Sequence, residues 1–232
     1  SLFFSLLFGI GIFAQTDSIS AHATFSRDLK ELSVKQEIRL HSQKSDSLKL
    51  LNWIAAYQSS KTDLAKRKLE DRNSDMHFAK AKDFGELLSL KVSVNGRNME
   101  VNTLHDENII LPIGSQSDGG LNIQLHYVLK LPSSQFTGYG VGKSSAMLKY
   151  FLLVPDSFYK NKKRNYLDIE ERVSYNTFWE VKIDAPSIYH VAGNLKEIEP
   201  RYFASLSNSD PEIYISIQPV NQMETMVEGK KV

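Results

Sequence analysis

The residues whose types and spacing could bind a phosphate lie at 137–144, in the order Thr-Gly-Tyr-Gly-Val-Gly-Lys-Ser. A phosphate-binding loop has the pattern G-x-x-x-x-G-K-[ST], because its backbone amides must curl round the phosphates while the lysine reaches them. Gly142, Lys143 and Ser144 match the end of this pattern, but Thr137 stands where the first glycine is required. The flanking sequence is β-prone rather than a strand followed by a helix. We therefore interpret this segment as a glycine-rich turn.

Histidines and carboxylates are the next candidates for chemistry, since zinc hydrolysis commonly uses H-E-x-x-H, with two imidazoles on one helix face and the glutamate as base. None of the histidines is followed by glutamate; they are His22, His41, His77, His105, His126 and His190. His105-Asp106-Glu107 is a short acidic cluster of neighbouring residues, and it is typical of a turn before a strand. A serine nucleophile motif, G-x-S-x-G, is also missing from the sequence. We predict no catalytic, cofactor-binding or metal-binding residue in this chain.

Composition narrows the classes of partner. The chain has 232 residues, a formal net charge of +1 and no cysteine, which excludes disulfides and cysteine-based zinc sites. A near-neutral chain has no overall field that would attract nucleic acid. The basic cluster Lys160–Arg164 lacks interleaved aromatic residues, so we interpret it as a solvated loop. We expect no nucleic-acid partner.

The first residues predict a compartment. Ser1–Ala14 is an uncharged apolar run that is followed by Gln15, Thr16 and Asp17. It is shorter than the ~20 residues of a membrane-spanning helix. Its length and the small Ala14 before a polar switch are typical of a secretory signal; the alternative is a buried N-terminal helix or strand. We expect residues 1–14 to be the remnant of a signal peptide, residues 15–232 to form one domain without a membrane span, and the mature protein to be secreted or periplasmic.

The elements that would position any site are mostly strands. Apolar residues alternate along Ile123–Leu131, which predicts a half-buried strand, while Met147–Val154 is continuously apolar, as in a strand covered on both faces or a short buried helix. Asn95-Gly96 is a strong hairpin signal, because both turn residues must accept a positive φ. Many short strands separated by turn residues predict a mainly β fold with twisted antiparallel sheets, as in a sandwich.

The N-terminal third is more mixed. We expect a polar lead-in at Thr16–Val34, a first strand at Lys35–Leu40 and a short helix at Thr62–Arg72, while Ser47–Tyr57 is ambiguous between helix and strand. Further strands are predicted around Leu88–Val94, Met99–Val101, Asn108–Ile113, Phe178–Ile183, Tyr189–Val191 and Glu212–Ile217.

The order of several short segments resembles the N-terminal β domain of secreted bacterial zinc metallopeptidases of the aminopeptidase N family. Each segment alone is weak, and their order and spacing over most of the chain carry the resemblance. The segments are Leu51-Asn-Trp53 with Ala56 and Tyr57, Leu64-Ala-Lys-Arg67 with Glu70 and Asp71, His77-Phe-Ala-Lys80, Val94-Asn-Gly96, Tyr127–Pro132, Phe136-Thr-Gly-Tyr-Gly140, Leu148-Lys-Tyr150, Val154-Pro155 and Phe158-Tyr159.

This resemblance implies a saddle-shaped, non-catalytic β domain that packs on a downstream catalytic domain and shapes the access of peptide substrate. The zinc site and the catalytic residues would lie in that domain, C-terminal to this chain. The sequence departs from the family after Tyr159, where Lys160–Asp168 is mostly charged and a segment rich in tryptophan and asparagine is expected. That departure leaves open whether the parent protein is an active peptidase. The alternative is a free-standing periplasmic or surface β-sandwich that binds a protein or glycan partner.

Overall fold

The computed structural model describes residues 16–42, 45–101, 104–114, 120–159 and 174–219, together with the backbone of strands β16 (Met226–Val227) and β17 (Lys230–Lys231). The predicted signal remnant at 1–14 and the basic cluster at 160–164 lie outside these residues. Within the described part of the chain, no helix is long and apolar enough to cross a membrane.

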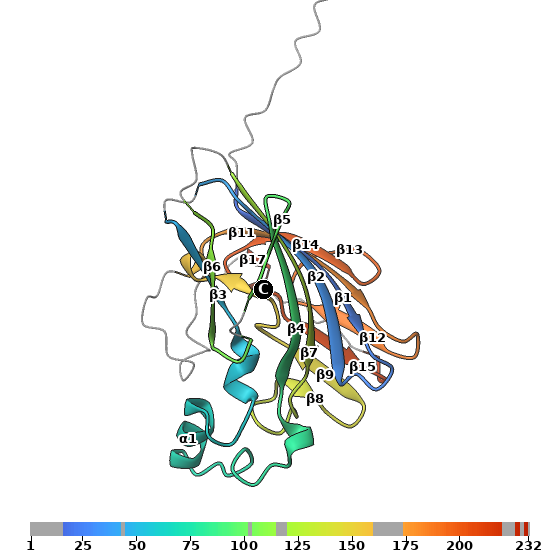
Figure 1. Cartoon of the computed structure of the whole chain (residues 1–232). Coiled ribbons are helices and arrows are strands. Elements are labelled where there is room, and N and C mark those ends of the chain that lie inside the picture. Colours follow the sequence, from blue (N-terminus) through green and yellow to red (C-terminus); the bar gives the residue numbers. More distant parts are fainter. Residues whose placement is uncertain are drawn as a thin grey trace, which may run out of the picture.

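The fold is built on one twisted eight-stranded sheet, with strand order β13-β14-β11-β1-β2-β7-β4-β5 (Figure 1). Its strands are β1 (Ser18–Phe25), β2 (Glu31–Leu40), β4 (Glu86–Val94), β5 (Arg97–Met99), β7 (Leu121–Lys130), β11 (Thr177–Asp184), β13 (Glu197–Glu199) and β14 (Tyr202–Ser207). The prediction of a mainly β fold with antiparallel sheets is confirmed, with one exception. Strand β1 pairs in parallel with β11, from Ser18 opposite Phe178 to Thr24 opposite Asp184.

The prediction of a polar lead-in at Thr16–Val34 is wrong, because this stretch contains β1 at the centre of the large sheet. Its inward positions are Ile19, Ala21, Ala23 and Phe25, all buried. Its outward positions are polar, and two of its inward side chains are only alanines, so the alternation carries a weak hydrophobic signal. Close packing of neighbouring strands is what makes such a strand stable there.

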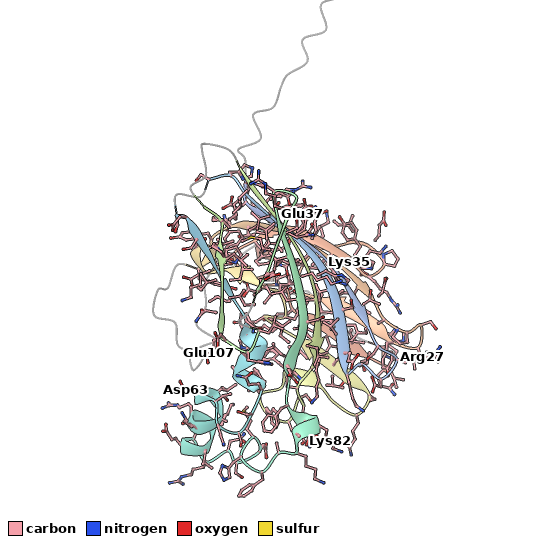
Figure 2. All side chains as sticks on the ribbon, viewed as in Figure 1. Arg27, Lys35, Glu37, Asp63, Lys82 and Glu107 are labelled. Atoms are coloured by element: carbon pink, nitrogen blue, oxygen red, sulfur yellow. The ribbon has the colours of Figure 1, made fainter. Side chains whose placement is uncertain are left out.

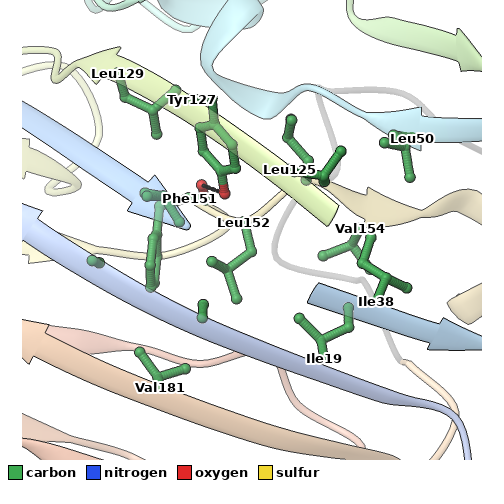
Figure 3. Close-up of a cluster of buried hydrophobic side chains, with 14 of the residues drawn as sticks. Ile19, Ile38, Leu50, Leu125, Tyr127, Leu129, Phe151, Leu152, Val154 and Val181 are labelled. Atoms are coloured by element: carbon green, nitrogen blue, oxygen red, sulfur yellow. Dashed lines mark hydrogen bonds between the residues drawn. The ribbon is translucent and has the colours of Figure 1, made fainter. Parts of the chain in front are cut away.

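Two smaller sheets cover the inner face of the large sheet. One has the order β10-β3-β6 and the other β12-β15-β9-β8. Their strands are β3 (Ser47–Leu51), β6 (Asn108–Pro112), β8 (Gly140–Val141), β9 (Ser145–Leu148), β10 (Val154–Pro155), β12 (His190–Gly193) and β15 (Ile213–Ser216). Leu50, Val154 and Ile215 of these sheets share one buried cluster with Ile38 and Leu125 of the large sheet (Figure 3). The core is therefore a sandwich of a large sheet on two small ones.

The segment Met147–Val154 is neither a continuous strand nor a helix. Strand β9 ends at Leu148, and Tyr150 then adopts a φ of 57° before β10 begins at Val154. Residues Tyr150–Val154 are nevertheless buried, as their apolar character predicts. The continuous apolar run therefore indicates that this segment is buried, but it does not indicate regular secondary structure.

A small helical lobe lies beside the sandwich (Figure 1). It contains the 3-10 helix η1 (Trp53–Tyr57), helix α1 (Asp63–Glu70) and the 3-10 helix η2 (Ala81–Asp83); a further 3-10 helix, η3 (Asp156–Phe158), follows β10. The predicted helix at Thr62–Arg72 is confirmed, with Thr62 as its N-cap. The ambiguous segment Ser47–Tyr57 divides into β3 and η1.

The predicted hairpin at Asn95-Gly96 is confirmed between β4 and β5. Asn95 has a φ of 47° and Gly96 a φ of 79°, as a two-residue turn of this kind requires. Because β5 forms the edge of the large sheet, this turn positions Asn98 at the rim of the surface described below.

Candidate functional site

The glycine-rich segment 137–144 is a turn. Residues Gly140–Val141 form strand β8, and Ser145 begins β9 directly afterwards, so no helix follows the loop. A Cβ atom on Gly140 would lie 2.1 Å from the carbonyl oxygen of Pro132, and this glycine has a φ of 115°. Gly140 is thus required because the backbone of Pro132 lies so close to it. This agrees with the interpretation of the segment as a glycine-rich turn and not as a phosphate-binding loop.

His22 and His126 lie on the solvent face of the large sheet, two strands apart, and the other four histidines lie elsewhere in the fold. Among the described residues, no group of three or more His, Cys, Asp or Glu side chains could hold a metal ion. His22 Nε2 lies 2.6 Å from Asp184 Oδ2, His41 Nδ1 lies 3.2 Å from Asp17 Oδ1, and the His77 ring packs edge-on against Phe78. In the acidic segment 105–107, the backbone carbonyl of His105 accepts a hydrogen bond from the Gln58 side chain, so this segment has a structural contact.

The solvent face of the large sheet carries a hollow with a volume of about 530 Å³. Seven strands line it, and the outward side chains are mostly polar. They are Ser20 and His22 of β1, Lys35 and Glu37 of β2, Lys91 and Ser93 of β4, Asn98 of β5, Gln124 and His126 of β7, Glu180 of β11 and Tyr202 of β14.

Cross-strand register sorts these side chains into two rows. One row is basic and runs across five neighbouring strands as Lys182, His22, Lys35, His126 and Lys91. The row two residues further along the strands runs as Glu180, Ser20, Glu37, Gln124 and Ser93. Successive residues of one row are direct cross-strand neighbours, so their side chains lie close together.

The two acidic groups of the second row have partners. Burial raises the pKa of the Glu37 carboxyl, but hydrogen bonds from Arg39 and Asn122 outweigh this effect and hold the pKa below its usual value. The Tyr202 hydroxyl donates a hydrogen bond to Glu180, which raises the pKa of the tyrosine. Each of the two carboxylates retains lone pairs for a further donor.

A second feature is an aromatic cluster in the helical lobe, separate from the main core. It contains Trp53, Ala56, Tyr57, Leu64, Ala65, Met76, Phe136 and Tyr150, with Ala79, Phe84 and Tyr139 packed against them. The ring centroids of Trp53 and Tyr57 lie 4.2 Å apart, and those of Trp53 and Tyr150 lie 5.8 Å apart. The Tyr57 hydroxyl lies 2.8 Å from Thr137 Oγ1, which ties the lobe to the glycine-rich turn.

One lysine closes this cluster. Lys149 Nζ lies 5.6 Å from the centroid of the Tyr139 ring, 5.2 Å from that of Tyr150, and 2.7 Å from Glu212 Oε1. Burial lowers the pKa of Lys149, but the Glu212 carboxylate and the two tyrosines outweigh that effect and raise it. The Lys149 ammonium is therefore held in place by one carboxylate and two aromatic rings.

No protein-family model matches the chain, and no curated protein sequence matches it. Solved structures do match. An aminopeptidase N family protein from Idiomarina loihiensis aligns with 92% of this chain and 31% of its own length, at 16% identity and a TM-score of 0.43. The M1 zinc metallopeptidase from Deinococcus radiodurans aligns with 94% of this chain and 46% of its own, at 10% identity and a TM-score of 0.49.

Yeast LTA4 hydrolase, solved in complex with bestatin, aligns with 87% of this chain and 28% of its own length, at 10% identity and a TM-score of 0.45. The chain resembles the N-terminal portion of M1 zinc metallopeptidases. This is the family that the sequence segments also resemble. The chain spans less than half of the length of each of these structures.

Sequence reasoning missed the hollow and its two rows. The local signal was present, since Lys35 and Glu37 alternate with buried residues along β2, as do Gln124 and His126 along β7. What the sequence lacks is the register that places residues 22, 35, 126 and 91 side by side. That register joins residues that are 13, 91 and 35 positions apart in the sequence.

Proposed function

We propose that this chain is the non-catalytic N-terminal β domain of a secreted zinc aminopeptidase-like metallopeptidase, which packs on a downstream catalytic domain and shapes substrate access. The observation that carries this proposal is the aromatic cluster of the lobe. Trp53, Tyr57, Leu64, Phe136 and Tyr150 come from four of the sequence segments that resemble the family, and they share one small core. Segments nearly a hundred residues apart thus act as one structural unit.

The lobe also offers a surface for a neighbouring domain. Phe78, within the segment His77–Lys80, is 79% exposed, and Leu69 of α1 is 43% exposed. A phenylalanine with this exposure gains free energy when a partner buries it, and aromatic residues commonly dominate interfaces. We assign Phe78 as the anchor of the interface with the downstream domain.

The proposal places zinc and all catalytic residues in the downstream domain, and peptide as the substrate of the parent enzyme. It also assigns a secretory signal to residues 1–14, and thus a secreted or periplasmic location. N-terminal sequencing of the mature protein from its native host tests that part: cleavage near Ala14 supports it, and an intact N-terminal segment in the cytoplasm contradicts it.

The main experiment reads the gene beyond codon 232 and expresses the downstream region as a separate, tagged polypeptide. Titration calorimetry then measures its binding to the chain described here. We expect an H-E-x-x-H motif in the downstream region and binding that weakens about tenfold in Phe78→Ala, the effect of losing an aromatic anchor. Ile188→Ala is the matched control, because Ile188 is also exposed but lies between β11 and β12.

Activity assays complete the test. The pure chain should hydrolyse no aminoacyl substrate and bind no stoichiometric zinc, while the downstream polypeptide should bind zinc. Zinc-dependent turnover by the pure chain would overturn the proposal. A stop codon soon after codon 232, or a downstream region without zinc ligands, would contradict the assignment to an active peptidase and leave a free-standing binding module or a diverged scaffold.

A further inference from the structure

The hollow on the solvent face carries separated charges that no part of the proposed function uses. Lys35 and Lys91 flank His126 on neighbouring strands, because both are its direct cross-strand partners. Within the described chain, no carboxylate lies within ion-pair distance of these three side chains. His126 Nε2 lies 3.5 Å from Ser33 Oγ. The ammonium groups therefore remain available for an anion.

An acidic pair occupies the other side of the hollow. Glu180 and Glu37 flank Ser20, again as its direct cross-strand partners on β11 and β2. Their partners are Tyr202 and the pair Arg39 and Asn122, which leave room at each carboxylate for another donor. This half of the hollow attracts a cation and repels a second anion.

We infer that the hollow binds a short peptide with free termini, its C-terminal carboxylate between Lys35 and Lys91 and its N-terminal ammonium between Glu180 and Glu37. The two charge pairs are centred two strands and two residues apart, which corresponds to about 12 Å. An extended tripeptide spans about 10–11 Å, and the long lysine side chains cover the difference.

The side chains between the two pairs suit peptide groups. Ser20, Gln124, Ser93 and Asn98 line the hollow, and each can donate to or accept from an amide. A phosphate-rich polymer fits less well, because two carboxylates lie in the same hollow. A sugar fits less well too, since Tyr202 is the only tyrosine, tryptophan or phenylalanine among the lining residues.

Titration of the full chain with trialanine, followed by amide NMR shifts, tests this inference. The unmodified tripeptide should shift the amides of β2, β4 and β7. N-acetylation or C-amidation should each weaken binding about tenfold, the effect of losing one charge-assisted contact. Inorganic phosphate, the competing anion, should bind more weakly than trialanine.

Variants locate the site. The double variant Lys35→Gln with Lys91→Gln should weaken the binding of trialanine about tenfold, while N-acetylation of the peptide should still weaken its binding to this variant. Glu180→Gln should weaken the binding of free-amine trialanine more than the binding of N-acetylated trialanine. The control is Lys61→Gln with Lys82→Gln, both exposed lysines of the helical lobe; Figure 2 labels Lys82 there, away from Lys35 and Glu37. We expect the control to bind as the native chain does.

Several results would overturn the inference. One is the absence of amide shifts at about 10 mM trialanine, which is roughly the weakest affinity that such contacts would give. Others are equal binding of the blocked and the free peptides, and tighter binding of phosphate than of trialanine. The last is a loss of trialanine binding in the control variant equal to the loss in the lysine variant. Amide spectra of each unliganded variant show whether it is folded. If the lysine variant fails to fold, Lys35→Gln and Lys91→Gln are measured singly.

Discussion

The Tyr127 hydroxyl donates a hydrogen bond to Gln36 Oε1 at 2.7 Å, in the interior between the large sheet and the segment that joins β9 to β10. Gln36 also donates from Nε2 to the Leu153 carbonyl at 2.7 Å and accepts from the Leu153 N–H at 3.2 Å. Figure 3 shows Tyr127 above Phe151, whose carbonyl lies 3.3 Å from the same hydroxyl. One glutamine thus replaces the strand partner that Leu153 lacks.

Gln36→Leu should therefore destabilise the chain by about 3 kcal/mol, because it leaves both backbone groups of Leu153 buried without a partner. Tyr127→Phe should cost about 1 kcal/mol, since Leu153 keeps its contacts with Gln36. Urea unfolding measures both. Gln124→Leu, on the solvent face of the same sheet, is the control and should change stability by about 0.5 kcal/mol or less. Equal losses at Gln36 and Gln124 would refute the role of this network.

Two glycines of the segment 137–144 should respond differently to alanine. Gly138 has a φ of 89° with open space around its Cβ position, so Gly138→Ala should cost about 1–2 kcal/mol. Gly140 combines its positive φ with a Cβ position 2.1 Å from the Pro132 carbonyl oxygen, so Gly140→Ala should cost about 3–5 kcal/mol. Thermal or urea unfolding separates the two. Similar losses would mean that the close contact relaxes without cost.

The pair Glu37 and Arg39 should give stability a local pH dependence. The folded pKa of Glu37 lies below its usual value of 4.5, so its contribution is present above about pH 4.5 and is lost as the pH falls through the folded pKa. A double-mutant cycle with Glu37→Gln and Arg39→Gln should give a coupling of about 0.5–1 kcal/mol at pH 7. The coupling should decrease as the pH falls through the folded pKa of Glu37. A coupling that stays constant down to the lowest pH at which the chain is folded would contradict the assignment.

Helix α1 should depend on its N-cap. Thr62 Oγ1 accepts a hydrogen bond from the Ala65 N–H at 3.3 Å and donates one to the Ala56 carbonyl at 2.8 Å, which joins α1 to η1. Thr62→Ala should cost about 1 kcal/mol and increase amide exchange in α1, while Thr62→Ser should retain most of the stability. Loss of the same size in the serine variant would assign the effect to the methyl group instead.

The sequence alone determined which segments become strands where the two faces differ strongly in polarity. Ile123–Leu131 alternates clearly and forms β7, and Asn95-Gly96 forms the predicted turn, because both signals depend only on neighbouring residues. The helix-forming residues and the charge order of Thr62–Arg72 predicted α1 for the same reason. The segments that resemble the metallopeptidase family were likewise readable from their order along the chain.

Only the tertiary structure decided how distant segments meet. The central position of β1, its parallel pairing with β11 and the irregular path after Leu148 depend on partners up to 160 residues away. The same holds for the basic and acidic rows of the hollow, whose members come from five strands. A register shift of one residue would move every one of these side chains to the opposite face, and no local pattern in the sequence specifies that register.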